Sequence, residues 1–408
     1  MNPYPMIPFE QARATILAHA RPLPPVRTSI YDAPGLVLAQ EVRAADPIPP
    51  FPASAMDGYA VRAAAGDAPR RVVATQWAGP AIAATVGPAQ AVRITTGAPL
   101  PAGADAVLKV EDAQERDGVV TPSQPVRVGD HVRPVGEDVE AGEVVLTPGT
   151  VLGPAEINVL AAIGRDEVLA HPRPRVAVLS TGNELVEAGQ PAAPGQIRDS
   201  NRPALMAAAR QVGAHVLSLG IAGDDDQALA EGVARGLAQA DVLITSGGVS
   251  MGERDLSRAA IEGHATVHFG QIAQKPGRPF VFATIQHPGA REQLVFGLPG
   301  FPAASLVTFE NLVRPALRAL AGHTRLLRPQ VRARLAHAVD CTGQRVEFMR
   351  ARIAWRDGGW WAEVTGLQTA GRVLSLVGAN AFLRLEPGTS HYEPGDEVTA
   401  VRIDQPEE

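Results

Sequence analysis

Residues 241–255 read DVLITSGGVSMGERD, and this stretch predicts the fold of the central part of the chain. Residues 242–244 have the length and the β-branched content of a buried strand. Gly247 and Gly248 then allow a sharp turn, which would leave amide N–H groups pointing outward to bind an anion. Asp255 is a hard oxygen ligand of the kind that binds Mg²⁺ beside a phosphate. The stretch therefore predicts a site for a phosphorylated ligand, although an ordinary turn with surface acids would have the same pattern.

The composition of the 408 residues indicates a folded globular protein of about three domains. Hydrophobic residues make up 45% and charged residues 20%, and the net charge of −6 argues against a nucleic-acid binder. Cys341 is the only cysteine, so no disulfide can form within the chain and a reducing compartment is favoured. The first residues lack the features of a signal peptide, and no apolar stretch approaches ~18 residues. We therefore expect a cytoplasmic protein with no membrane segment.

Only two of the 37 basic residues are lysines, Lys109 and Lys275. A compact ammonium and a planar guanidinium are not equivalent at a tight site, so a lysine kept in such an arginine-rich chain is predicted to be required. Lys275 lies between a Gly/Pro turn and an apolar strand, whereas Lys109 lies in a strand-like segment and is predicted to face solvent.

Two segments with helical spacing of apolar residues, 9–20 and 153–164, have a similar character. We therefore predict that residues 1–45 and 139–173 form one discontinuous linker or dimerisation domain. Residues 46–138 begin with a proline-dense stretch and continue as short β-like runs split by Gly and Pro. They are predicted to be an inserted β-rich domain.

Residues 174–325 alternate strand-like and helix-like segments, which is typical of a doubly wound α/β domain with parallel strands. The expected strands are 176–179, 215–219, 242–244, 280–284 and 294–296, and the expected helices are 203–212, 226–239 and one after 302. Residues 326–408 read as a small, closed β-barrel-like domain with a hairpin turn at Asp357-Gly358-Gly359. The fold class is therefore α/β plus β, in several domains.

Ligands bind a doubly wound sheet beyond the carboxyl ends of its strands. Four expected strand ends carry polar residues or glycines, at 180–184, 220–226, 245–255 and 297–300. We expect these four segments to converge on one cleft.

Several motifs follow one another along the chain: SAMDGYA at 54–60, TTGA at 95–98, RPVGED at 133–138, STGNEL at 180–185, DSN at 199–201, the stretch 241–255, KPGRP at 275–279 and GLPGFP at 297–302. In this order they resemble the molybdopterin molybdenumtransferases, the bacterial molybdate-inserting enzymes and the E-domain of gephyrin. The resemblance covers essentially the whole chain.

The resemblance implies insertion of molybdate into molybdopterin that is carried as its adenylate, with release of AMP and with Mg²⁺ present. It also implies four domains and a homodimer in which the β-rich domain reaches the partner subunit. Molybdopterin adenylyltransferase and other proteins of the cofactor pathway are then candidate partners. Such a pyrophosphate-bridged substrate needs amide N–H groups, cations and carboxylates around it.

The resemblance also implies which residues are functional. Those matching catalytic positions are Asp57, Thr96, Asp138, Glu184, Asp224, Asp255, Lys275, Arg278 and Arg350. Those matching cofactor-binding positions are Thr181, Gly182, Ser246, Gly247, Gly248, Ser250, Pro299, Gly300 and Pro302. Those expected to organise the metal are Glu184, Asp224 and Asp255.

Some of these residues have a purely structural alternative. Residues 224–226 could cap the following helix, and Glu184 could complement a helix dipole. Asp57 with the glycine after it could be only a turn signal. Arg350, taken alone in a β-run, would most often be a solvated surface residue.

The chain departs from the family pattern at three places. Gln271 stands where a basic residue is usual, Phe301 where asparagine is common, and Thr369-Ala370 where a Gly-Ser pair is frequent. Losing one cation and two polar groups could weaken oxyanion binding or change the preferred anion, tungstate included. Two alternatives therefore stay open: a diverged binding or scaffold protein, and a generic Mg²⁺-dependent nucleotide pyrophosphatase.

Overall fold

The computed structural model describes residues 5–247, 265–286, 289 and 291–404. Contacts divide the chain into two compact units. Unit 1 comprises Met1–Val26, Gly35–Val37 and Ala170–Glu408, and unit 2 comprises Arg27–Pro34 and Leu38–Leu169. Each unit is described by itself below.

A seven-stranded sheet in the order β1-β20-β22-β23-β19-β15-β18 forms the centre of unit 1. Four neighbouring strands are parallel: β23 (Gln293–Leu298), β19 (Val242–Ser246), β15 (Arg175–Thr181) and β18 (His215–Ala222). This part confirms the predicted doubly wound arrangement.

The other side of the sheet differs from the wholly parallel prediction. β22 (Pro279–Ile285) runs antiparallel to both β23 and β20 (Ala265–Ile272), and β20 was not predicted from the sequence. The connections between these strands are too short for a crossover helix, which needs a dozen or more residues, so neighbouring strands must reverse direction. β1 (Met6–Ile7) extends the sheet in parallel with β20.

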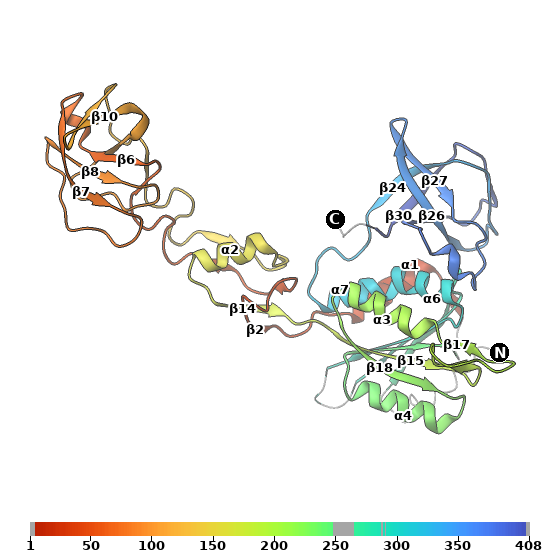
Figure 1. Cartoon of the computed structure of the whole chain (residues 1–408). Coiled ribbons are helices and arrows are strands. Elements are labelled where there is room, and N and C mark those ends of the chain that lie inside the picture. Colours follow the sequence, from red (N-terminus) through yellow and green to blue (C-terminus); the bar gives the residue numbers. More distant parts are fainter. Residues whose placement is uncertain (1–4, 248–264, 287–288, 290, 405–408) are drawn as a thin grey trace. The chain divides into compact units, whose positions relative to one another are not determined.

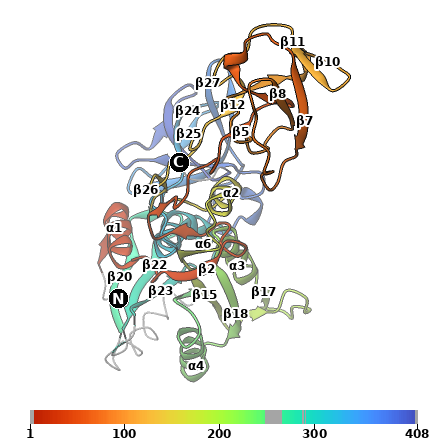
Figure 2. The same cartoon turned by 90° about the vertical axis from the view of Figure 1, so that its left-hand side faces the viewer.

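Helices cover both faces of this sheet, as Figures 1 and 2 show. α4 (Asp226–Leu237) lies on one face and packs with Leu229 and Val233 against the sheet. The other face carries α1 (Phe9–His19), α3 (Asn201–Gln211), α6 (Pro302–Thr308), a π-helical turn (Phe309–Val313) and α7 (Arg314–Leu320).

The helix expected at 9–20 therefore packs with the α/β part of the chain, although the sequence grouped it with residues 139–173. Phe9, Ala12 and Ile16 are buried in the same core as the sheet. The domain boundaries drawn from the sequence stay predictions.

Residues 330–402 contain the closed β-barrel that was predicted. Its strands pair around a ring in the order β26 (Val346–Arg356), β27 (Gly359–Val364), β24 (Gln330–Leu335), β30 (Glu397–Arg402) and β28 (Ala381–Leu385), and β28 pairs with β26. Asp357 (φ 51°) and Gly358 (φ 75°) form the predicted hairpin turn. β21 (Gln274–Lys275) pairs in parallel with the start of β26, and β25 (Val339–Asp340) pairs with β29 (His391–Tyr392).

Unit 2 is rich in strands, as expected. Its largest sheet has the order β10 (Ala113–Arg116), β11 (Val119–Pro122), β7 (Arg70–Gln76), β8 (Gln90–Ile94), β6 (Gly58–Val61) and β9 (Ala106–Lys109). Two short pairs join β5 (Ala53–Ser54) to β12 (Val132–Arg133) and β4 (Val42–Arg43) to β13 (Val144–Leu146). α2 (Pro154–Ala162) confirms the second predicted helix.

Three further strands, β2 (Val26–Ser29), β14 (Glu167–His171) and β3 (Val37–Leu38), form a separate sheet. No helix within the described ranges is long and apolar enough to cross a bilayer.

Candidate functional site

The four strand ends that carry polar residues or glycines lie along one edge of the seven-stranded sheet. The register places Thr181 beside Ala222, and Ser246 beside both Ser180 and Leu298. Because β18, β15, β19 and β23 are parallel neighbours, their carboxyl ends are level with one another. This arrangement confirms that the four segments start from the same edge.

The loop that carries Lys275 and Arg278 lies at this edge as well. β20 runs antiparallel to β22, which runs antiparallel to β23, so β20 ends and β22 begins at the edge where β23 ends. In strand order β22 and β15 are three positions apart, which corresponds to ~14 Å at ~4.8 Å per strand. The edge therefore has basic residues toward one end and the acidic residues Glu184 and Asp224 toward the other.

Two loops at the acidic end are joined by a reciprocal pair of hydrogen bonds. Asn183 N–H donates to Asp224 Oδ2 at 3.2 Å, and Asp224 N–H donates to Asn183 Oδ1 at 3.1 Å. The helix-capping alternative applies to the neighbouring residue, because Asp225 accepts from the N–H groups of Gln227 and Ala228 at the start of α4. Asp224 is left exposed at the strand end.

Glu184 is exposed beside the same loop. The residues after it form the short strand β16 (Leu185–Val186), which pairs with β17 (Ile197–Arg198), so the helix-dipole alternative is wrong. Its carboxylate folds back over Gly182, where an added Cβ would lie 2.3 Å from Glu184 Oε2. With φ at +142°, Gly182 supplies both the conformation and the space that this carboxylate needs.

Gly247 explains why the turn after β19 needs glycine. Its φ is +93°, and a Cβ there would lie 2.4 Å from the carbonyl oxygen of Thr181. The Gly247 N–H donates to Leu298 O at 3.3 Å, so it does not point outward to an anion as the sequence suggested. Gly248, Ser250 and Asp255 lie outside the described residues.

Asn201 is a site residue whose role the sequence did not reveal. Its Nδ2 donates to Ser246 Oγ at 2.8 Å and to Gly300 O at 2.7 Å, which ties the end of β19 to the loop after β23. In the sequence, its place in the DSN motif at the start of a helix was the one indication of a role. Pro299 is buried beside this contact, and Pro302 is the first residue of α6.

Thr181 carries a buried hydroxyl at the end of β15. The residue is 6% exposed, and among the described residues its Oγ1 has no hydrogen-bond partner. A buried hydroxyl without a partner costs about 1–3 kcal/mol. Its position favours a polar ligand at this strand end.

The Lys275–Arg278 loop is held tightly from both sides. Gln274 Nε2 donates to Pro276 O at 2.7 Å, and a Cβ on Gly277 would lie 2.2 Å from Thr308 Oγ1 on α6. Arg278 Nε donates to Gln271 Oε1 at 2.9 Å. The glutamine that replaces the usual basic residue therefore holds a guanidinium in place.

Arg350 is completely buried, so the expectation of a solvated surface residue is wrong. Its Nε donates to Ser375 Oγ at 3.0 Å, and one terminal nitrogen donates to Thr369 O at 3.0 Å. The other terminal nitrogen has no partner among the described residues. Burial lowers the pKa of Arg350 to about 10, which still leaves the guanidinium charged at neutral pH.

The loop that accepts from Arg350 also meets the GLPGFP segment. Ala303 N–H donates to Ala370 O at 3.0 Å, one residue after Thr369. One loop therefore contacts both Arg350 and the start of α6, which follows the site loop after β23. The sequence did not predict this contact, because the three segments are far apart in the chain.

Asp57 and Thr96 are brought together on unit 2, where both are exposed. Asp57 Oδ1 accepts from Thr96 N at 2.7 Å and from Thr96 Oγ1 at 2.9 Å, and these bonds lower the pKa of the carboxyl group. Asp138 Oδ2 accepts separately from Arg133 at 2.6 Å. Asp57 therefore joins its own turn to the loop at Thr96, and its functional role stays a prediction.

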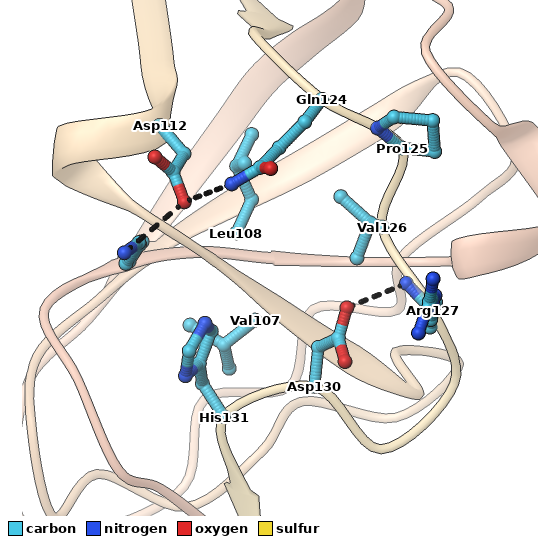
Figure 3. Close-up of a pocket in the computed structure, with 10 residues that line it drawn as sticks. Val107, Leu108, Asp112, Gln124, Pro125, Val126, Arg127, Asp130 and His131 are labelled. Carbon is cyan, nitrogen blue, oxygen red and sulfur yellow. Dashed lines mark hydrogen bonds and ion pairs between the residues drawn. The ribbon is translucent and has the colours of Figure 1, made fainter.

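Unit 2 also contains a pocket of about 380 Å³, drawn in Figure 3. It does not include Asp57, Thr96 or Asp138. Lys109 was expected to face solvent, but it is half-buried. It pairs with Asp112 at 3.2 Å, and Gln124 donates to Asp112 at 2.7 Å. None of the catalytic, cofactor-binding or metal residues that the resemblance implies and the structure describes lines this pocket, so we place the candidate site at the sheet edge.

The described residues contain no group of three or more His, Cys, Asp or Glu side chains arranged to hold a metal ion. Glu184 and Asp224 provide hard oxygen donors on adjacent loops, which suits Mg²⁺ with further ligands from water or substrate phosphate. The donor chemistry fits the ion, and the metal site itself stays a prediction.

Three family models match successive parts of the chain. The MoeA N-terminal region (domain I and II) matches residues 7–164, the probable molybdopterin binding domain matches 177–319, and the MoeA C-terminal region (domain IV) matches 332–403.

Individual relatives agree with these models over nearly the full length of this chain. Molybdopterin molybdenumtransferase of Haemophilus influenzae is 34% identical over 404 residues, which cover 97% of this chain and 98% of that protein. Gephyrin of Dictyostelium discoideum is 32% identical over 424 residues, covering 92% of this chain and 59% of gephyrin. The crystal structure of a molybdopterin biosynthesis moea protein from Pyrococcus horikosii has a TM-score of 0.82 and 29% identity, covering 98% of this chain and 99% of that one. The chain therefore belongs to the molybdopterin molybdenumtransferase family.

Proposed function

We propose that this chain inserts molybdate into molybdopterin carried as its adenylate, and that the reaction releases AMP and requires Mg²⁺. The observation that carries the proposal is the edge of the seven-stranded sheet. Acidic loops lie toward one end of it, after β15 and β18, a loop with Lys275 and Arg278 lies toward the other, and the ends of β19 and β23 lie between them. A pyrophosphate-bridged ligand matches this order of charges, because its phosphates would meet the acidic loops through Mg²⁺ while molybdate would meet the basic loop.

At the acidic end, Glu184 and Asp224 would hold Mg²⁺, which when bound neutralises phosphate charge and makes the phosphate a better leaving group. Asn183 keeps the Asp224 carboxylate in place through their paired hydrogen bonds. The Thr181 hydroxyl, which has no hydrogen-bond partner in the described part of the chain, would donate to a phosphate oxygen next to them.

At the basic end, Lys275 and Arg278 would bind molybdate and orient it. Fixed cations aimed at an oxyanion lower the barrier mainly through charge stabilisation and alignment. Arg350 would contribute positive charge from barrel strand β26, because it is buried and still protonated at neutral pH.

We extend the proposal to a homodimer in which Asp57 and Thr96 serve the site of the other subunit. The support is that their carboxylate and hydroxyl are paired and exposed on unit 2. A protein that makes molybdopterin adenylate is the natural partner, since it would supply the substrate.

The deciding experiment measures AMP release from molybdopterin adenylate by the purified chain, with and without molybdate and Mg²⁺. We expect release that depends on both. AMP release without any need for molybdate would favour a nucleotide pyrophosphatase instead. Tight binding without release would favour a scaffold protein, and a higher rate with tungstate would change the assigned anion.

A further inference from the structure

Glu347 is a buried acid on barrel strand β26 that faces Lys275. The Glu347 side chain is 3% exposed, and its Oε2 lies 3.0 Å from Lys275 Nζ. Lys275 and Glu347 are also direct register partners in the parallel pairing of β21 with β26. Partners in such a pairing extend their side chains to the same face, so the backbone itself sets the contact.

The second carboxylate oxygen of Glu347 is fixed by Thr342. Thr342 N–H donates to Glu347 Oε1 at 2.5 Å, and the Thr342 hydroxyl donates to the same oxygen. Turning the carboxylate away would break both bonds to Thr342 and leave a buried Glu347 oxygen without a donor, which is costly. Oε2 therefore points in one direction, toward the lysine.

The Lys275 ammonium keeps N–H donors that a ligand could accept from. Its side chain is 39% exposed, and an ammonium has three N–H donors, of which Glu347 Oε2 can accept one. We infer that Glu347 is a positioning residue that holds the Lys275 ammonium for the oxyanion substrate. This inference rests on the proposed function. In it, Glu347 belongs to the same site but acts through Lys275 and does not itself contact the substrate.

The pairing has two opposite effects on an anionic substrate. Glu347 fixes the ammonium, which favours a fast reaction, but its negative charge offsets part of the attraction for an anion. Removing only the charge should therefore raise affinity and lower turnover. A residue that merely stabilised the fold would not change the two constants in opposite directions.

The first test uses the fact that the chain has only two lysines. Uniform ¹⁵N-lysine labelling gives two side-chain ammonium signals, which Lys109→Arg assigns. Glu347→Gln should shift or broaden the Lys275 signal and leave Lys109 unchanged. The matched control is Asp112→Asn, which removes the acid 3.2 Å from Lys109 and should affect only the Lys109 signal. A Lys275 signal indifferent to Glu347→Gln would overturn the inference.

The second test measures steady-state AMP release against molybdate concentration. In Glu347→Gln we expect kcat to fall at least about tenfold, since a misplaced catalytic contact is costly. We expect KM for molybdate to fall about two- to fivefold. Glu347→Asp keeps the charge but withdraws the carboxylate by one methylene, so it should lower kcat without lowering KM.

The double variant Glu347→Gln with Lys275→Met decides whether Glu347 acts through the lysine. Starting from Lys275→Met, adding Glu347→Gln should change neither constant by more than about twofold. Additive losses, or a fall in Tm with unchanged kcat and KM, would mean a structural role and overturn the inference. If the unaltered chain shows no molybdate-dependent AMP release, the proposed function fails, while the NMR signals still decide whether Glu347 holds Lys275.

Discussion

Asn183 and Asp224 each donate a backbone N–H to the side chain of the other, at 3.2 and 3.1 Å. This exchange joins the loops after β15 and β18 across the edge of the sheet. An exposed carboxylate would otherwise sample many rotamers, so the pair holds the acid in one position before a ligand binds. It also separates the role of Asp224 from that of its neighbour, which leads to the first prediction.

Asp224→Ala and Asp225→Ala should have different effects although the residues are adjacent. Asp224→Ala should abolish Mg²⁺-dependent AMP release with little loss of stability. Asp225→Ala removes the N-cap of α4 and should cost about 0.5–2 kcal/mol in the free energy of unfolding while activity persists. Denaturant melts and the AMP assay on both variants check this. Equal activity in the two variants would remove Asp224 from the site.

Lys275→Arg should lose at least about tenfold in kcat, or ~1.4 kcal/mol, although it keeps the charge. The reason is that a guanidinium is longer and planar and would pair with Glu347 through two of its N–H groups, so its charge and remaining donors would not lie where the compact ammonium places them. Lys109→Arg is the matched control and should have parental activity. Near-parental turnover in Lys275→Arg would show that charge alone is needed there.

Gly247→Ala should destabilise the protein by about 2 kcal/mol or more, because the position combines a φ of +93° with a close backbone contact. Gly189→Ala is a suitable comparison, since a Cβ there meets no heavy atom within 4 Å. We expect its effect to stay within about 0.5 kcal/mol. Chemical unfolding of both variants measures the difference, and equal stabilities would contradict the packing argument.

His323 should make unfolding depend on pH in the acid range. Burial and the nearby Arg318 and Arg314 lower its pKa to about 4 from 6.5. The unfolded chain therefore binds a proton more readily, so stability is complete above pH 6.5 and is lost as pH falls toward 4. This corresponds to at most about 3 kcal/mol, which solvent screening of a half-buried ring reduces to about 1–2 kcal/mol.

The measurement for His323 is the free energy of unfolding at several pH values between 4 and 7. His323→Gln should flatten the curve over this range. An unchanged slope would assign the acid sensitivity to other groups.

Mixed dimers test whether two subunits share each site. Asp57→Ala and Asp224→Ala should each be inactive alone. With random mixing, about half of the dimers contain one subunit of each kind, and each of these has one intact site. Recovery should then approach roughly a quarter of parental activity. No recovery after confirmed subunit exchange would place both residues in one chain's site, or remove Asp57 from catalysis.

Local sequence was enough to predict much of this molecule. The alternation of apolar runs with helical segments predicted β15, α3, β18, α4 and β19, because side-chain periodicity and helix caps are properties of neighbouring residues. Asp357-Gly358 predicted the barrel hairpin for the same reason, since few residues adopt positive φ at both turn positions. The shared edge of the polar strand ends could be predicted from the order of strands and helices along the chain, because parallel strands end at the same edge of a sheet.

Tertiary structure alone decided the rest. The direction of β20 and β22 depends on which strands become neighbours, and the burial of Arg350 depends on a loop that carries the distant residues Thr369 and Ser375. The partner of Lys275 is Glu347, on a strand far away in the sequence. Burial, charge pairing and strand direction arise from contacts between distant segments, whereas helices, turns and strand ends arise from the residues next to them.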